Sequence, residues 1–426
     1  MRNGLICMGL LCAVFLASVA SADAGTRYIK AGHLLDVVNG KLLDNQVIVI
    51  DGDTISRVAP AGSVSIPAAA DVIDLGAMTV LPGLIDMHDH LTGDHRLHGY
   101  SSLAVSIPRE ALYGAYNAGI TLRAGFTSVR NVGASGYTDV ALRDAINDGE
   151  IEGPRIRASG PALGITGGHC DNNLLPEEFH ATGEGVANGP WAVRAKVREV
   201  IKYGADVIKF CATGGVLSKG DSVGGQQYTL EEMQALVNEA HQHGRKVAAH
   251  AHGAEGIIAA ITAGVDSIEH ASLVDDEGIR LAKQNGTYFV MDIYNDTFIL
   301  EHGAEVGMLP ESLEKERQIG QLQRDNFKKA FKSGVKMAFG SDGAVYPHGD
   351  NAKQFAYMVQ YGMTPMQAIQ AATVKAADLL GWPDKVGQIS AGYFADIIAV
   401  SGKPLDNVRV LENVDFVMKG GRVYKD

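Results

Sequence analysis

Short apolar runs alternate with amphipathic segments between about residue 81 and residue 381, and this alternation restricts the fold more than any other feature. Eight of the runs have the length and composition of β-strands: 81–90, 127–133, 154–160, 206–212, 246–253, 266–272, 287–293 and 336–343. Several intervening segments end in glycine just before the next run, namely at Gly125, Gly204, Gly244, Gly264, Gly286 and Gly334. This order predicts β/α units in a parallel sheet. Eight units in about 300 residues match the size of a (β/α)8 TIM barrel.

The doubly wound sheet is the competing architecture for such a chain. That fold is expected to place a glycine-rich phosphate turn after its first strand. Here the first strand ends in Met87-His88-Asp89-His90 instead. The segment 229–243 supports a helix between strands, since Thr229 and Glu232 form the sequence signature of a capping box. The barrel is therefore the expected fold.

Both ends of the chain differ from this middle part. Residues 28–81 read as short strands separated by turns, and Asn39-Gly40 is a strong hairpin signal. The segments 395–400 and 416–423 have the same texture. Two β-rich flanks thus enclose the alternating region.

Residues 1–22 have the pattern of a cleaved secretory signal. A short positive start, an apolar run over 4–18 and Ala20-Ser21-Ala22 follow one another. The run is shorter than the roughly 20 residues that a membrane anchor needs. We therefore expect a periplasmic or secreted protein without a stable membrane anchor.

Composition excludes some partners and leaves one pairing open. The net charge is −12 and the basic residues are scattered, which argues against nucleic acid as a partner. Beyond the expected signal, Cys170 and Cys211 are the two cysteines. They could pair in an exported protein, but a core of this size needs no disulfide, and Cys211 alone reads as a core residue.

Polar residues with metal-ligand chemistry follow or end five of the expected strands. They are His88, His90, Lys209, His250, His252, His270 and Asp342. Such groups are costly to bury without a partner, and the C-terminal ends of barrel strands converge on one rim. A lone histidine at a strand end is usually a core residue, but His88 and His90 point to the same face of one strand and can bind one ion. His95 and His98, in a polar loop, are set aside.

Lys209 is the residue that best distinguishes a structural interpretation of these strand ends from a metal site. It lies between Ile208 and Phe210, so its amine must find a counter-charge, lose its proton or be chemically modified. Taken alone, a pairing with a buried carboxylate is favoured. Next to four strand-end histidines, a lysine carboxylated by carbon dioxide that bridges two cations explains the pattern better. Asp342 then suits a metal ligand that also transfers a proton.

These motifs resemble those of the amidohydrolase superfamily. Leu81-Pro82-Gly83-Leu84-Ile85-Asp86-Met87-His88-Asp89-His90 is similar to its first-strand signature, and Lys209, His250, His270 and Asp342 match its other ligands in order. Residues 166–169, 209–216 and 227–229 resemble the branch of Xaa-Pro dipeptidases, Xaa-Arg/Lys carboxypeptidases and ochratoxin-hydrolysing amidases. The resemblance implies a barrel over 81–384 and a small composite β-sandwich domain from 23–80 and 385–426.

The same resemblance implies roles for the site residues. His88, His90 and Asp342 would hold the more buried of two divalent ions, His250 and His270 the more exposed one, and carboxylated Lys209 would bridge them. Zinc is the expected metal. Water acidified by both ions would attack, and Asp342 would carry its proton. His169 would polarise the carbonyl or hold the oxyanion, Tyr228 would bind the substrate's α-carboxylate, and His252 would face the pocket as a supporting or substrate contact.

The expected reaction is hydrolysis of the amide bond to a C-terminal L-amino acid. The substrate would be a dipeptide or an N-acyl amino acid with a free carboxylate, such as ochratoxin A, and relatives of this branch form homo-oligomers up to octamers. A mononuclear deaminase or cyclic-amidine hydrolase is the alternative, because His252-Gly253-Ala254-Glu255 offers an HxxE match. Lys209 favours two metals. A non-catalytic binding protein would have an incomplete ligand set, and the identity of the C-terminal residue stays open.

Overall fold

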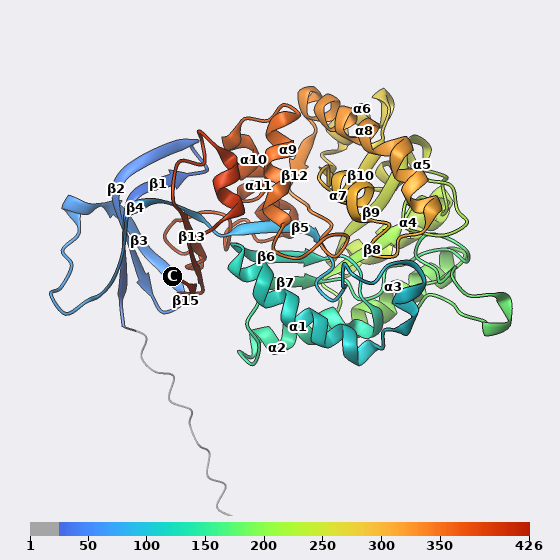
Figure 1. The fold of residues 1–426 in the computed structure, drawn as a ribbon, viewed down its shortest axis with the longest axis horizontal. Helices are drawn as coiled ribbons and strands as arrows, with labels where there is room; N and C mark the ends of the chain where they lie inside the picture. The colour runs from blue at the N-terminus through green and yellow to red at the C-terminus, as the bar shows by residue number, and fades with distance from the viewer. Residues whose placement is uncertain (1–24) are drawn as a thin grey trace, which may run out of the picture.

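The two ends of the chain combine in one sheet, which forms the β-rich part of the molecule in Figure 1. The computed structural model describes residues 25–426, so the predicted signal segment 1–22 lies outside the described residues. The sheet has seven strands in the order β15-β14-β13-β4-β1-β2-β3. Their bounds are β1 Arg27–Asp36, β2 Lys41–Asp51, β3 Thr54–Pro60, β4 Asp71–Pro82, β13 Ile397–Val400, β14 Phe416–Lys419 and β15 Arg422–Lys425.

Turn chemistry and non-local pairing shape this sheet. β1 and β2 pair antiparallel from Asp36 and Lys41 outward, across the predicted Asn39-Gly40 turn, where Gly40 has a φ of 66°. β4 is central: it pairs parallel with β1 and antiparallel with β13. Residues from both ends of the chain, such as Ile29 and Ile397, share one buried cluster. The sheet therefore exists only through contacts between distant segments.

Eight parallel strands form the barrel, as the alternation predicts. Their bounds are β5 Leu84–Asp89, β6 Phe126–Asn131, β7 Arg155–Ala158, β8 Val207–Cys211, β9 Lys246–Gly253, β10 Ser267–Leu273, β11 Tyr288–Val290 and β12 Lys336–Ala338. The ladders β5-β6-β7 and β12-β11-β10-β9-β8 are joined at both seams. At one seam Met87 N donates to Phe339 O at 2.9 Å, and at the other Cys211 N donates to Leu163 O at 2.9 Å. The expected fold class is confirmed.

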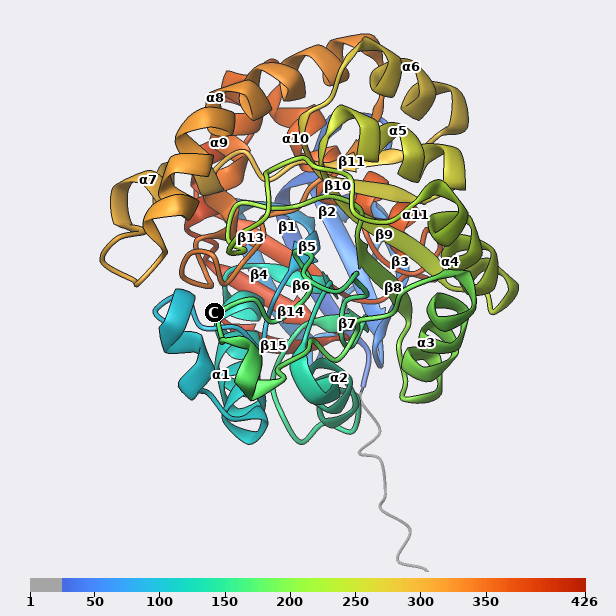
Figure 2. The ribbon, with the colours of Figure 1, turned by 90° about the vertical axis from the view of Figure 1, so that its right-hand side faces the viewer.

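Helices surround these strands in the view of Figure 2. Their bounds are α1 Ile107–Arg123, α2 Thr138–Asn147, α3 Pro190–Lys202, α4 Leu230–Gln242, α5 Ala254–Ala263, α6 Asp276–Asn285, α7 Asn295–His302, α8 Pro310–Ser333, α9 Gln354–Gln360, α10 Pro365–Ala371 and α11 Val374–Leu380. The predicted capping box is present at the start of α4, where Thr229 and Glu232 bond reciprocally. Gly264 and Gly334 end α5 and α8 in the left-handed conformation, as glycine permits.

The last two barrel strands are shorter than the sequence suggests. β11 stops at Val290 and β12 at Ala338, although apolar character continues beyond each strand. Past β12 the chain bends so that Asp342, at a φ of 58°, donates its N–H to His88 O at 2.7 Å. The regular ladder ends because this backbone turns inward over the rim.

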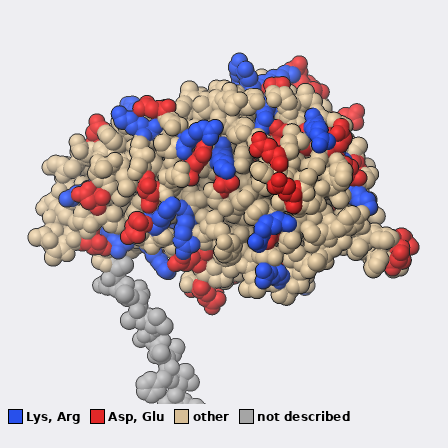
Figure 3. All heavy atoms as spheres, viewed as in Figure 1, with Lys and Arg blue, Asp and Glu red and all other residues tan. Residues whose placement is uncertain are grey.

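The surface carries charges of both signs. Lys and Arg side chains lie interspersed with Asp and Glu on the face that Figure 3 shows. This mixture agrees with the scattered basic residues of the sequence. Within residues 25–426, none of the helices combines the length and the hydropathy that crossing a bilayer requires.

Candidate metal centre

A cavity of about 340 Å³ opens at the C-terminal ends of the barrel strands. Eight of the predicted site residues line it, from β5, β8, β9, β10 and the loops that follow β5, β7 and β12: His88, His90, His169, Lys209, His250, His252, His270 and Asp342. This is the rim where barrel enzymes place their chemistry. The remaining predicted residue, Tyr228, is not part of this lining.

His88, His90 and Asp342 form the first ligand group. Their ligand atoms lie within 4.8 Å of one another. Nε2 of His88 is 3.2 Å and Nε2 of His90 is 3.3 Å from Oδ1 of Asp342. Asn295 Nδ2 donates to the other carboxylate oxygen at 2.9 Å. Two imidazoles and a carboxylate held this way suit a divalent ion such as zinc.

His250, His252 and His270 form the second ligand group, again within 4.8 Å. Nε2 of His250 is buried and has no hydrogen-bond partner within the described chain. Such an unsatisfied nitrogen costs about 1–3 kcal/mol, which a bound cation would remove. Asp292 joins His270 and Asp342 in a further cluster of the same size, between the two groups. The donor set therefore fits two metal ions.

The ligands of the first group differ from one another in burial, since His88 is 1% exposed. The side chain of His90, in the first group, is 31% exposed, whereas His250 in the second is 3% exposed. His90 also lines a neighbouring cavity.

Lys209 projects into the cavity with 4% of its surface exposed. Burial lowers the pKa of its amine to about 8, although Glu269 and Asp342 oppose the shift. Within residues 25–426, no carboxylate oxygen lies within 4.0 Å of its Nζ. The pairing with a buried carboxylate that the sequence favoured for a lone lysine is therefore absent from the described chain. A buried amine that sheds its proton easily can react with carbon dioxide.

Buried carboxylates orient several of the imidazoles. Glu269 Oε2 lies 3.1 Å from Nδ1 of His88, and Arg130 donates to Glu269 Oε1 at 2.7 Å. Burial alone would raise the pKa of Glu269, but Arg130 and His88 hold it below its ordinary value. Asp292 Oδ1 lies 2.8 Å from Nδ1 of His270. Partners of this kind fix ring orientation and raise ligand basicity.

Strained backbone conformations at two of the ligands also indicate a functional site. His270 and Asp342, one from each ligand group, have φ values of 69° and 58°. Residues other than glycine rarely occupy this region, and they do so mostly where function requires it. Both aim their side chains into the cavity.

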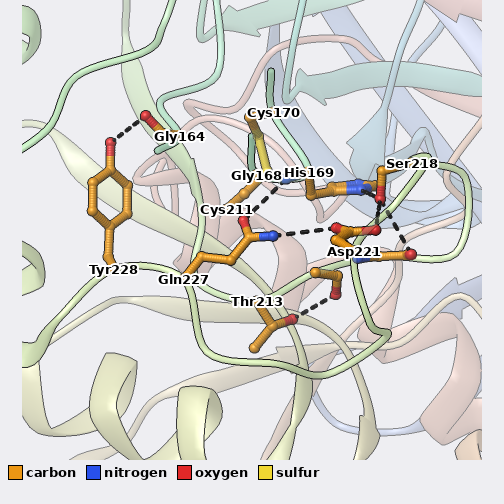
Figure 4. The surroundings of a disulfide bond; sticks show 12 residues. Gly164, Gly168, His169, Cys170, Cys211, Thr213, Ser218, Asp221, Gln227 and Tyr228 are labelled. Atoms are coloured by element: carbon orange, nitrogen blue, oxygen red, sulfur yellow. Dashed lines mark hydrogen bonds between the residues drawn. A yellow bond between two sulfur atoms is a disulfide. The ribbon is translucent and has the colours of Figure 1, made fainter. Parts of the chain in front are cut away.

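His169 lies in the loop between β7 and α3, and its ring stacks on His250 with centroids 4.1 Å apart. Its Nδ1 lies 2.8 Å from Ser218 Oγ, and Ser218 donates to Asp221 Oδ1 at 2.7 Å (Figure 4). Lys315 of α8 completes the chain with an ion pair to Asp221 at 2.9 Å. Burial lowers the pKa of His169 to about 4, although Asp221 opposes the shift. The arrangement leaves Nε2 of His169 available to a bound molecule.

Tyr228 corrects one prediction. It is 1% exposed, and its hydroxyl lies 2.8 Å from Gly164 O (Figure 4). The same hydroxyl lies 2.9 Å from Ala187 O. Two backbone carbonyls thus occupy the hydroxyl that was expected to bind a substrate carboxylate. The ring packs against Phe210 in the core. Tyr228 is a structural residue that joins both ends of the His169 loop, and it does not face the cavity.

The structure pairs Cys170 with Cys211 in a disulfide, with Cα atoms 6.0 Å apart. The sequence left this pairing open and assigned Cys211 to the core. Cys211 is buried, with 2% of its surface exposed, and both cysteines also line the cavity. Glu255, on which the deaminase alternative depends, is exposed in the first turn of α5 and is not among the lining residues.

Several residues of the site were missed from the sequence. Asp292 follows an apolar strand, so the strand-end argument that found Asp342 could have found it. His98, set aside as a loop residue, lines the cavity and has a buried Nε2 without a hydrogen-bond partner in the described chain. Ser218, Asp221 and Lys315 carry no local signal, because loop and helix meet only in the folded chain.

A second cavity of about 690 Å³ adjoins the first and shares His90, His169, Cys170 and Leu217 with it. Glu110, Glu184 and Lys219 give its outer wall charges of both signs. The site can therefore accept a molecule with two parts, one over the ligand groups and one in the outer cavity.

Comparison with known proteins agrees with this geometry. The pattern of the amidohydrolase family matches residues 79–424. Ochratoxinase from Aspergillus niger is 35% identical over 433 aligned residues, which cover 96% of this chain and 88% of the ochratoxinase; its crystal structure gives a TM-score of 0.85 at 33% identity, covering 94% and 95% of the two chains. The crystal structure of a Xaa-Pro dipeptidase with methionine bound in the active site gives 0.89 at 43% identity, covering 94% and 100%. A prolidase complexed with N-methylphosphonate-L-proline gives 0.86 at 32% identity, covering 94% and 100%.

Proposed function

Because the chain belongs to the amidohydrolase family and is a hydrolase of amide bonds, we propose that it is a binuclear metal enzyme that releases the C-terminal L-amino acid of dipeptides or N-acyl amino acids. The observation that carries the binuclear assignment is Lys209, buried and without a carboxylate partner in the described chain, in the cavity that both ligand groups line. Carboxylation would turn its amine into a ligand that two ions can share.

The residues present would divide the metals between them. His88, His90 and Asp342 would hold one ion and His250 and His270 the other, with carboxylated Lys209 common to both. Zinc suits imidazole and carboxylate ligands. When bound, the ions would polarise the scissile carbonyl and make a water molecule acidic enough to attack at neutral pH.

The chain's own residues then handle the proton and the oxygen. Burial would raise the pKa of Asp342, but His88 and His90 hold it well below its ordinary value, so the side chain is a carboxylate that can accept a proton. It would take the proton of the attacking water and deliver it to the leaving amine. Because Ser218 donates to Asp221, Nδ1 of His169 donates to Ser218, so the ring would donate from Nε2 to the carbonyl oxygen as an imidazolium, which the negative charge that develops there would stabilise.

The cavity walls support a substrate with an apolar side chain next to the scissile amide. Leu217, Ile299, Ile319 and Val345 line the inner cavity. The similar proteins act on an ochratoxin or on Xaa-Pro dipeptides, according to their names. Ochratoxin A, cleaved to ochratoxin alpha and L-phenylalanine, is accordingly one substrate to test.

A substrate panel tests this function. Metal-free protein is reconstituted with zinc, with and without bicarbonate, and supplied with dipeptides and N-acyl amino acids that differ only in the C-terminal residue. We expect release of the free amino acid and a rate that depends on bicarbonate. Ammonia release from nucleobases without release of an amino acid would instead support the deaminase alternative.

We also propose that the protein works outside the cytoplasm, as the pattern of residues 1–22 predicts. The Cys170–Cys211 bond supports this location, since disulfides persist in oxidising compartments. Fractionation of cells that produce the full chain, with the disulfide state assayed in each fraction, tests it. An active protein found with free thiols in the cytoplasm would contradict it.

A further inference from the structure

The disulfide joins two elements that carry different parts of the site. Cys170 directly follows His169, and Cys211 lies two residues beyond Lys209 on β8. Alternate residues of a strand share a face, so Cys211 points into the cavity beside Lys209. Figure 4 shows the bond beside the His169 backbone. One covalent link thus connects the strand of the expected bridging lysine to the residue that precedes Cys170.

The other restraints on His169 come from a neighbouring loop. Its backbone N–H donates to Gln227 Oε1 at 3.0 Å, and its ring meets Ser218 Oγ at 2.8 Å. Both partners belong to the loop 212–229 that follows β8. This loop is itself fastened to α8, since Lys315 donates to Ser218 O at 2.8 Å. Without the disulfide, the hydrogen bonds of His169 would only tie one loop to another, and its ring would rest on His250.

Close packing also restricts the position of the His169 ring. A Cβ added at Gly215 would lie 2.3 Å from both Cε1 and Nδ1 of His169. The ring therefore fills a slot between Gly215 and His250, on which it stacks. A small shift of Cys170 would move this ring out of its slot.

We propose that the Cys170–Cys211 disulfide is a positioning element for His169, which it holds over the second ligand group so that the ring meets the scissile carbonyl. The inference rests on the proposed function, because it gives His169 a role in that reaction. A purely structural disulfide would lower the melting temperature on removal and leave kcat unchanged. A positioning disulfide lowers kcat through His169, by about 10- to 100-fold if the ring moves by about 1 Å.

The first test is a cycle of variants assayed on the best substrate of the panel. Cys170→Ser with Cys211→Ser should lower kcat by about 10- to 100-fold, with KM and the metal content little changed. In a His169→Asn background the same double substitution should cause no further loss, because both changes remove one interaction. Full kcat without the disulfide, or losses that multiply in the combined variant, would overturn the proposal.

Reduction of the folded protein covers the case in which the double variant does not fold. A water-soluble phosphine breaks the S–S bond: each sulfur gains a proton and an electron, and the phosphorus takes oxygen from water to become the phosphine oxide. Wild-type activity should fall as two thiols appear, with the zinc content constant. Thiols that appear without loss of kcat would refute the positioning role.

Gly215→Ala provides a variant that leaves both cysteines in place. The added methyl displaces the ring, so kcat should fall as in the disulfide variant. Gly62→Ala is the matched control, since its added Cβ meets nothing within 4 Å, and it should keep wild-type kcat.

Hydrogen exchange separates this inference from the proposed function. Loss of the disulfide should increase amide exchange over residues 164–186 whether or not a substrate has been found. Increased exchange in a protein that cleaves nothing in the panel would count against the proposed function alone. Unchanged exchange together with unchanged kcat would count against the positioning role alone.

Discussion

The two ligand groups, two histidines with an aspartate and three histidines, are prepared for metal in different ways. His88 faces Asp342 on one ring nitrogen and Glu269 on the other. Burial and Lys209 would lower the pKa of His88, yet these carboxylates raise it to about 9. In contrast, burial and the rings of His169 and His270 hold the pKa of His250 well below its ordinary value. In the first group, the carboxylates therefore stabilise a proton on His88 where a metal ion would bind. In the second group, His250 is neutral and its nitrogen lone pair is free to bind an ion.

This difference affects two properties of a metal site: how well the ligands are arranged before metal binds, and whether a proton competes with the metal. The first group keeps its shape without metal, but an ion must displace a proton there. In the second group, burial holds the pKa of His250 and of His252 well below its ordinary value, so these two rings have no proton to lose on binding. The largest effects are therefore expected where one residue serves both groups.

Lys209→Ala should impair both ligand groups at once, because it removes the residue that they share. Activity should fall by about 10³-fold or more, as expected when transition-state stabilisation of several kcal/mol is lost. The assay is kcat/KM on the best substrate together with metal content, and a short carboxylic acid should restore part of the rate. Full activity in this variant would eliminate the bridge.

Glu269→Gln and Asp292→Asn form a matched pair that addresses one group each. Each weakens the carboxylate that orients a ligating imidazole, so each should lower the affinity for one ion by about 10- to 100-fold. Zinc titration of the metal-free variants should show the first site weakened in Glu269→Gln and the second in Asp292→Asn. Equal weakening of both sites in both variants would show that the groups act as a single unit. Melting temperatures serve as a control, since Arg130 loses its charged partner in Glu269→Gln.

A pH series sharpens the comparison without mutation. His88 is protonated below a pKa of about 9, so zinc affinity at the first group should rise about tenfold per pH unit between pH 7 and pH 8. His250 is already neutral there, so affinity at the second group should rise less steeply, since only the loss of the Lys209 proton, which both groups share, contributes to it. Calorimetry in buffers of different ionisation enthalpy counts the protons released. Equal slopes at both sites would contradict the assignment.

Tyr228→Phe should have the smallest effect on catalysis. The hydroxyl bonds backbone carbonyls in the core, so its loss should cost about 1 kcal/mol of stability and leave KM within about twofold. Thermal denaturation and KM for substrates with a free carboxylate measure both. A tenfold rise in KM would instead support the contact between the Tyr228 hydroxyl and the substrate carboxylate that the sequence predicts.

The sequence predicted those parts of the molecule that periodicity and strand ends encode. All eight barrel strands are present, and the residues at their ends, from His88 to Asp342, meet in one cavity. What it did not predict depends on how loops fold back. Tyr228 was predicted to lie in the site because residues 227–229 resemble a motif of the family. In the structure, its hydroxyl is directed to the backbone carbonyls of residues 164 and 187. The network from His169 through Ser218 to Lys315 joins three segments with no shared period, so no local pattern could reveal it.

The central position of β4, between β1 and β13, has a consequence for how the chain matures. During synthesis β4 emerges more than 300 residues before its partner Ile397–Val400, so one edge of its hydrogen-bonding groups stays open until nearly the whole chain has been made. Pairing over such separation is slow. The cluster that Ile29 and Ile397 share can therefore close only after the C-terminal strands have been made, so the β-rich part of the molecule is completed last.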